Sequence, residues 1–220
     1  MHKHTIGLIG GTGIEGRGIA IRLAATGCQV GLGSRSSDRA RQVARELNEQ
    51  LGQSSIDGVD NATLVAEAEL LFITVPFIHV DALLLEHSNK FTSSQVVVDV
   101  TVPLLFDKGP RLLDLPEGSG AEHLAKQLPS HVPLVAAFKT MPAQMLADVG
   151  SAINCDEFVC SDNAEAKKRA LEVLGKIEGI RWIDAGPLRN CRTLERMTLL
   201  AIDINRRYKI KTARFQVVGL

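Results

Sequence analysis

A glycine-rich segment near the start of the chain carries the clearest chemical signal. Gly11, Gly13 and Gly16 form a GxGxxG pattern that follows an apolar run and opens a segment of helical character. In such a loop the first glycine permits a tight turn, the second lets the backbone approach a pyrophosphate, and the third allows helix and strand to pack closely. The free N–H groups of the helix start then favour a phosphate. The segment predicts a dinucleotide-binding loop, the alternative being a tight strand–helix turn without a ligand.

A second polar group follows the next predicted strand, about 20 residues beyond the glycines. An NAD-binding loop usually has Asp or Glu there to bind the ribose hydroxyls, whereas this chain has Ser34 and Arg35. Arg39 lies one helical turn further on and on the same side. A hydroxyl and two guanidinium groups suit a 2′-phosphate. We therefore expect NADP rather than NAD, the alternative being a solvated basic helix start.

The elements that must position these residues alternate short apolar runs with segments of helical periodicity, which is typical of a parallel α/β sheet. We expect a Rossmann-type doubly wound parallel sheet over residues 1–142. A small C-terminal α/β extension over 143–220 would contribute to the coenzyme cleft and to oligomerisation. The predicted strands are 5–9, 29–33, 55–59, 70–75, 96–100, 132–136, 158–160 and 180–183. The predicted helices are 16–25, 36–51, 121–128, 164–177 and 188–208, and an irregular connection is expected after residue 102.

Composition excludes several classes of protein. The 25 basic residues balance 25 acidic ones, which argues against a nucleic-acid or membrane-surface binder. No stretch has the ~20 mostly apolar residues that a membrane span needs, and the start of the chain does not resemble a signal peptide. Four cysteines without CxxC or Cys/His spacing argue against a disulfide framework or a metal site. We expect a cytoplasmic protein.

Several stretches, taken together and in order, resemble one known family. They are residues 10–13, 33–35, 74–77 with His79, 101–103, 135–143 and 184–190. Over essentially its whole length the chain resembles the NADPH-dependent F420 reductases, also called F420H2:NADP oxidoreductases. The segments AFKTMPA and DAGPL are the most specific, because the glycine and Ser-Arg motifs occur in many NADP enzymes.

The resemblance implies a reaction. A hydride would pass directly between the nicotinamide C4 of NADP(H) and C5 of the deazaflavin coenzyme F420. Because both cofactors carry their own chemistry, the protein need only hold the two rings face to face and exclude water. No protein acid, base or metal is required.

The resemblance also implies which residues form the site. Thr12, Gly13, Ile14 and Glu15 would contact the pyrophosphate, and Ser34, Arg35 and Arg39 the 2′-phosphate. Phe77, Val102 and Ala143 would lie along the ribose and nicotinamide. The deazaflavin would stack near Pro76, Pro103 and the segment 138–142.

Lys139 departs from the family, since the archaeal members typically have histidine there. Its ammonium could pair with the 8-hydroxyl or a ring carbonyl of the deazaflavin, indicate another acceptor, or simply extend to solvent. His79 follows an apolar loop at a strand end, where α/β sites form, although capping a helix start would explain it equally well. A basic run, Arg206, Arg207, Lys209 and Lys211, would hold the acidic tail of F420 or form a solvated helix end.

Two other functions remain open at this point. One is an NADPH-dependent reductase of another acceptor: a flavin, a ferric chelate, or an imine or carbonyl compound. An imine or carbonyl reductase would need a proton donor near the nicotinamide, for which Lys139 and His79 are the candidates. The other is an NADP-binding redox sensor without turnover. Partners are expected to be small-molecule cofactors and a second copy of the chain, as a homodimer or higher oligomer.

Overall fold

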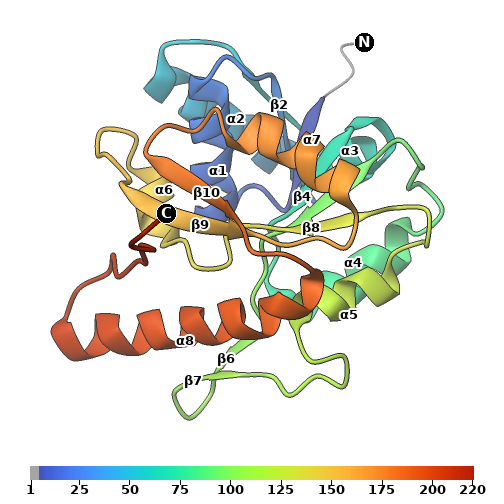
Figure 1. Ribbon diagram of the computed structural model, residues 1–220. Helices are drawn as coiled ribbons and strands as arrows, with labels where there is room; N and C mark the ends of the chain where they lie inside the picture. The colour runs from blue at the N-terminus through green and yellow to red at the C-terminus, as the bar shows by residue number, and fades with distance from the viewer. Residues whose placement is uncertain (1–4) are drawn as a thin grey trace.

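The centre of the molecule is a six-stranded parallel sheet in the order β3-β2-β1-β4-β5-β8 (Figure 1). The computed structural model describes residues 5–220. The strands are β1 (Ile6–Ile9), β2 (Val30–Ser34), β3 (Ile56–Asp60), β4 (Leu70–Ile73), β5 (Val96–Asp99) and β8 (Leu134–Ala136). All five neighbouring pairs are parallel. The six predicted strands of this region and the Rossmann-type order are therefore confirmed.

Helices cover both faces of the sheet, which explains why most of its strands are apolar throughout. One buried cluster joins α1 (Ile14–Ala25) and α2 (Ser37–Leu51) to one face. A second cluster joins α3 (Asn61–Glu67), α4 (Val80–His87) and α5 (Gly120–Gln127) to the other. A short 3-10 helix, Phe77–His79, precedes α4. The chain thus winds over both faces, and the strand order reverses next to β1.

Local sequence explains the start and end of α2. The side chain of Ser36 accepts a hydrogen bond from the backbone N–H of Arg39, and Gly52 ends the helix with a left-handed φ of 67°. Between them Ala40, Val43 and Leu47 are buried at helical spacing. The cap at Ser36 therefore fixes where Arg35 and Arg39 lie relative to the end of β2.

The C-terminal region forms a second, two-stranded sheet. Strand β9 (Cys155–Val159) pairs in parallel with β10 (Ile180–Asp184), and α7 (Ala164–Leu174) connects them. The backbones of Ala136 and Cys160 exchange hydrogen bonds of 2.8 and 3.0 Å, which tie this sheet to β8. Buried residues of β9 and α7 belong to the same core cluster as those of β1. The division at residue 142 stays a prediction.

Helix α6 (Ala143–Ala147) packs directly on α1. A Cβ on Gly18 would lie 2.5 Å from the Cβ of Leu146, so the close approach requires glycine there. Arg22 of α1 donates to the carbonyl groups of Met145, Leu146, Asp148 and Ser151, which follow one another around the end of α6. The structure thus joins the first helix of the chain to the start of the C-terminal region.

The connection after residue 102 is more ordered than predicted. Strands β6 (Leu104–Phe106) and β7 (Pro110–Leu112) form an antiparallel hairpin, which the many Pro and Gly residues had suggested would be irregular. The long helix α8 (Cys191–Tyr208), after a 3-10 turn at Leu188–Asn190, runs beside this hairpin (Figure 1). Among the described residues, no helix is both long and apolar enough to cross a membrane.

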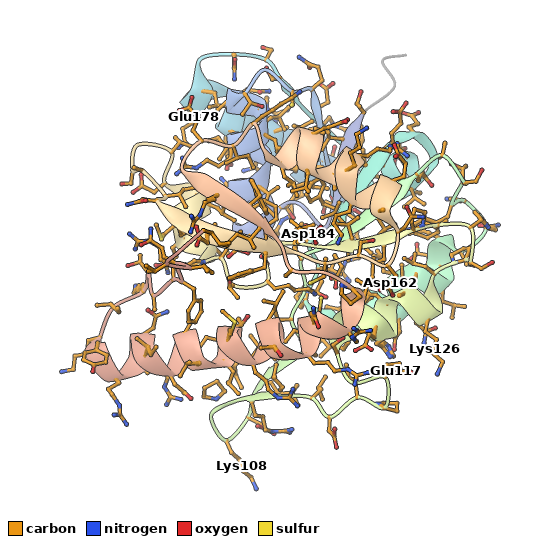
Figure 2. All side chains as sticks on the ribbon, viewed as in Figure 1. Lys108, Glu117, Lys126, Asp162, Glu178 and Asp184 are labelled. Carbon is orange, nitrogen blue, oxygen red and sulfur yellow. The ribbon has the colours of Figure 1, made fainter. Side chains whose placement is uncertain are left out.

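Helix α5 is held by a cluster of charged side chains around His123. Its ring lies 2.8 Å from Asp81 and 3.1 Å from Glu117. Burial alone would lower the pKa of His123, but these two carboxylates raise it. Lys126 lies 3.0 Å from Glu117, and Figure 2 shows the two side chains together at the edge of the molecule. The cluster fixes α5 beside Phe77, whose ring centre is 5.7 Å from that of His123.

Candidate nucleotide cleft

The glycine loop has the geometry of a phosphate-binding turn. The turn itself falls at Gly10, whose φ is 72°, one residue before the predicted Gly11. A Cβ on Gly16 would lie 2.5 Å from the Cα of Gly11, so close packing of helix and strand is confirmed. A Cβ on Gly13 would meet nothing nearer than 3.9 Å, and no side chain caps the helix start there. The first N–H groups of α1 are therefore available to an anion.

Asn61 supports this loop and was not singled out from the sequence. Its Oδ1 accepts a hydrogen bond of 3.2 Å from the backbone N–H of Gly10, and the residue is buried. Asp60 precedes it and caps α3 by accepting from the N–H of Thr63 at 2.9 Å. The sequence signal that could have identified Asn61 is the pair Asp60-Asn61, which directly follows a predicted strand. Asn61 holds the loop from the neighbouring βα connection.

A cavity of about 860 Å³ opens beside the loop, at the carboxyl ends of β1 to β4. The strand order reverses at this edge, where ligands bind in open α/β sheets. Of the predicted site residues, Thr12, Gly13, Ser34, Arg35, Arg39, Pro76 and His79 line it. Further lining residues are Gly10, Ser36, Asp60, Asn61, Ala62, Thr74, Val75, Ala82, Leu83, Glu86 and His87. The structure thus brings the two sequence motifs to one cleft.

The arginines at the end of β2 are suited to binding an anion. Arg35 and Arg39 are exposed, and within residues 5–220 neither side chain has a carboxylate partner within ion-pair distance. Asp38, the acid nearest to them in the sequence, pairs with Arg41 at 2.6 Å. Ser34 is buried at the cavity wall, where its Oγ accepts from the N–H of Ser36 at 3.3 Å. Two uncompensated guanidinium groups therefore face one side of the cleft.

The other predicted site residues do not line this cavity. Gly11 and Gly16 lie buried beneath the loop, and Ile14 and Glu15 occupy the first turn of α1. Phe77 packs on His123. Val102, Pro103, Lys139 and Ala143 lie outside the cavity, as does the exposed basic run at the end of α8. The cavity thus covers the predicted adenosine and pyrophosphate half of the cofactor site.

Lys139 is fully buried, so the expectation that it extends to solvent is wrong. Its Nζ lies 2.5 Å from Oδ2 of Asp99 and 3.7 Å from Oε1 of Glu195, and it donates to the carbonyl of Thr101. Burial alone would lower the pKa of Lys139, but Asp99 and Glu195 raise it. The preceding residue, Phe138, has a left-handed φ of 56°. Lys139 is a buried cation that ties β5 to the end of β8.

Glu195 has a second role in the same cluster. Its two oxygens accept from the N–H of Gly120 at 3.0 Å and of Ala121 at 3.3 Å. These are the first N–H groups of α5, so a residue of α8 caps α5. Burial raises the pKa of Glu195, against the opposing effect of Lys139. The cluster therefore joins β5, β8, α5 and α8.

Two further carboxyl groups near the cluster have raised pKa values. Burial raises the pKa of Glu15 to about 8, although the residue is only half-buried; Lys139 opposes this, while Asp99 and Glu157 add to it. Burial likewise raises the pKa of Glu157 in β9 to about 8. Thr140 donates to its Oε1 at 2.6 Å, and its Oε2 has no partner among the described residues. A pKa of this size favours the protonated form of Glu157 at neutral pH.

The fold and the cleft define the class of this protein as a Rossmann-fold oxidoreductase. A family model described as "NADP oxidoreductase coenzyme F420-dependent" matches residues 5–103. The F420-dependent NADP reductase of Methanothermobacter thermautotrophicus is 34% identical over 98% of this chain and 95% of its own length. The enzyme of that name from Methanocaldococcus jannaschii is 32% identical over 98% of both chains. The chain belongs to the family of F420-dependent NADP reductases.

Solved structures agree on the fold. A protein from Arthrobacter sp. FB24, described as a candidate F420-dependent NADP reductase, superposes with a TM-score of 0.82 at 23% identity. That match covers 98% of this chain and 99% of the other. A pyrroline-5-carboxylate reductase from Coxiella burnetii has a TM-score of 0.60 at 14% identity, over 94% of this chain and 71% of the other. The Rossmann-type fold class is confirmed.

Proposed function

We propose that this chain transfers a hydride between NADP(H) and coenzyme F420, as the names of its relatives describe for them. The main support for NADP as one of the two reactants is the pair of arginines, Arg35 and Arg39, at the end of β2. They have no carboxylate partner among the described residues, and they line the cavity beside the glycine loop. Membership of the family supports F420 as the other reactant. NADP(H) and F420 both act as substrates, and they supply the hydride chemistry themselves.

The pyrophosphate of the cofactor would lie on the backbone of Thr12, Gly13, Ile14 and Glu15, and its 2′-phosphate would lie between Ser34, Arg35 and Arg39. Phe77, Val102 and Ala143 would lie along the ribose and nicotinamide. The deazaflavin would stack near Pro76, Pro103 and the segment 138–142. Lys139 is buried behind these residues, where its ammonium group holds Asp99 and the carbonyl of Thr101 in place.

We propose that the protein is cytoplasmic and forms a homodimer or a higher homo-oligomer. Each chain would have two parts, divided near residue 142. Helix α8 supports an oligomer, because Leu200 is 52% exposed and Met197 and Ile204 beside it are only partly covered. An apolar stripe of this kind on a helix is typical of a subunit interface.

A spectroscopic assay tests the function. Purified protein is mixed with NADPH and oxidised F420, and the visible absorbance of the deazaflavin is followed, with NADH and FMN as parallel controls. Rapid bleaching with NADPH and F420 alone is the expected result. Tight NADPH binding without bleaching would overturn the acceptor and leave the NADP site standing.

A further inference from the structure

His79 is an exposed side chain on the cavity wall that has no partner inside the protein. It ends the 3-10 turn before α4, but its side chain makes no hydrogen bond to the start of that helix, so the expectation that it caps the helix is wrong. Within residues 5–220 its ring makes no hydrogen bond or ion pair. An imidazole ring carries at least one N–H donor in either protonation state. This donor is therefore free and accessible to a ligand in the cavity.

The 3-10 turn directs its three side chains to different sides. Such a turn has three residues per turn, so successive side chains point about 120° apart. Phe77 packs toward α5, with its ring centre 5.7 Å from that of His123. Ile78 is exposed and lies outside the cavity lining. The contact of Phe77 with α5 therefore anchors the turn and leaves His79 at the cavity wall.

This turn follows a strand that lies beside the glycine loop. Strands β1 and β4 pair in parallel, with Ile9 opposite Ile73, so the loops that follow them leave the sheet side by side. The two loops touch, since a Cβ on Gly10 would lie 2.3 Å from Cγ1 of Val75. Beyond this contact the glycine loop and His79 line the same cavity. A pyrophosphate on the glycine loop would therefore have the connection between β4 and α4 on its other side.

That connection offers few polar side chains to a ligand. Between β4 and α4 the cavity-lining residues of the described chain are Thr74, Val75, Pro76 and His79. Val75 and Pro76 have apolar side chains, and Thr74 is buried, with its hydroxyl donating to the carbonyl of Ile9 at 2.8 Å. On this side of the cavity, His79 is therefore the residue whose side chain can donate to an anion.

We propose that His79 donates a hydrogen bond to the pyrophosphate of NADP(H), from the wall opposite the glycine loop. The N–H groups at the start of α1 reach the phosphates from one side. A ring N–H on the other wall would hold the pyrophosphate between the two. Hydrogen bonds to a charged acceptor are stronger than those between neutral groups. The inference rests on the proposed NADP site and gives His79 a binding role in it.

Three ligands that share the adenosine 2′-phosphate test this role. Adenosine 2′-monophosphate ends at the ribose, adenosine 2′-phosphate 5′-diphosphate adds the pyrophosphate, and NADPH adds the nicotinamide half. His79→Ala should weaken the last two by similar factors, about 10-fold, and leave the first unchanged. His79→Gln, whose amide can still donate, should recover part of the loss. Ile78→Ala is the matched control, because Ile78 is exposed on the same turn and outside the cavity, and it should change none of the three.

Isothermal titration calorimetry without F420 gives each dissociation constant. Because His79 is exposed, its variants should fold as the wild type does. A loss confined to NADPH would place His79 at the nicotinamide half, and an equal loss for adenosine 2′-monophosphate would indicate a general change in the cleft. Either result would overturn the proposal, as would unchanged binding of all three ligands.

Arg35→Asp separates this proposal from the NADP site on which it rests. It should weaken all three ligands, because each carries the 2′-phosphate. If it does so while His79→Ala changes nothing, only the role of His79 is overturned. If Arg35→Asp leaves all three unchanged, the cleft assignment is overturned as well.

Discussion

Replacing Lys139 with methionine should strongly destabilise the protein, although the substitution keeps nearly the same shape. The side chain is fully buried, and its ammonium contacts the carboxylate of Asp99 and the carbonyl of Thr101. Methionine fills the volume but leaves Oδ2 of Asp99 without a partner. The other oxygen of Asp99 keeps two hydrogen bonds, from the N–H of Thr101 at 2.8 Å and from its hydroxyl at 2.7 Å.

The size of the effect follows from what is left behind. Removing one partner of a buried ion pair typically costs about 3–5 kcal/mol, because the remaining charge is uncompensated. Since two hydrogen bonds still support Asp99, we expect the lower end, about 3 kcal/mol. For a chain of this length, that corresponds to a fall in Tm of roughly 6–12 °C.

Urea unfolding at pH 7, followed by circular dichroism, measures this loss. Lys108→Met is the matched control, since that lysine extends into solvent from the β6–β7 hairpin (Figure 2) and should change stability by less than about 0.5 kcal/mol. The pair Asp99→Asn with Lys139→Met should cost at least 1 kcal/mol less than the sum of the single variants. A loss below 1 kcal/mol for Lys139→Met, or full additivity, would refute the reasoning.

Three shorter predictions follow from the same structure. Arg35→Asp should reduce the ratio of kcat/KM for NADPH to kcat/KM for NADH by about 10- to 100-fold, because the substitution removes charge-assisted hydrogen bonds to the 2′-phosphate. An unchanged ratio would contradict the role of Arg35 in binding that phosphate. Asn61→Ala should raise KM for NADPH several-fold with little change in kcat, as it frees the backbone of Gly10; steady-state kinetics on a variant with native circular dichroism would show it. Burial raises the pKa of Glu157 from its ordinary 4.5 to about 8. The folded protein therefore holds a proton that the unfolded chain releases above pH 4.5. The free energy of unfolding should fall as the pH rises from about 5 to 8. Urea titrations across this range should show a smaller slope in Glu157→Gln, and an identical slope would count against the buried acid.

The sheet and the phosphate loop could be predicted because their signals are local. Apolar runs marked the strands, and the predicted helix 36–51 begins at Ser36, the residue that caps α2. The partners of Lys139 could not be predicted in this way. Asp99 lies 40 residues away, and it meets Lys139 only because β8 pairs beside β5, with Asp99 opposite Ala136. Such a contact depends on strand order and register, which short sequence patterns do not encode.

The role of Asn61 was missed for a related reason. It is an ordinary polar residue at the end of a strand, and helix capping would explain it equally well. Its contact with the glycine loop depends on how α3 packs beside β1. Likewise, the β6–β7 hairpin contains the Pro and Gly residues typical of loops, and its two strands have three residues each.

The contact between α1 and α6 bears on which step of the catalytic cycle would limit turnover. Arg22 donates to four carbonyl groups around the end of α6, and Gly18 permits these helices almost to touch. A hinge motion between α1 and α6 would have to break these contacts. The position of α6 relative to α1 is therefore set when the chain folds. We expect turnover to be paced by the entry and departure of ligands, with no large closing motion in the cycle.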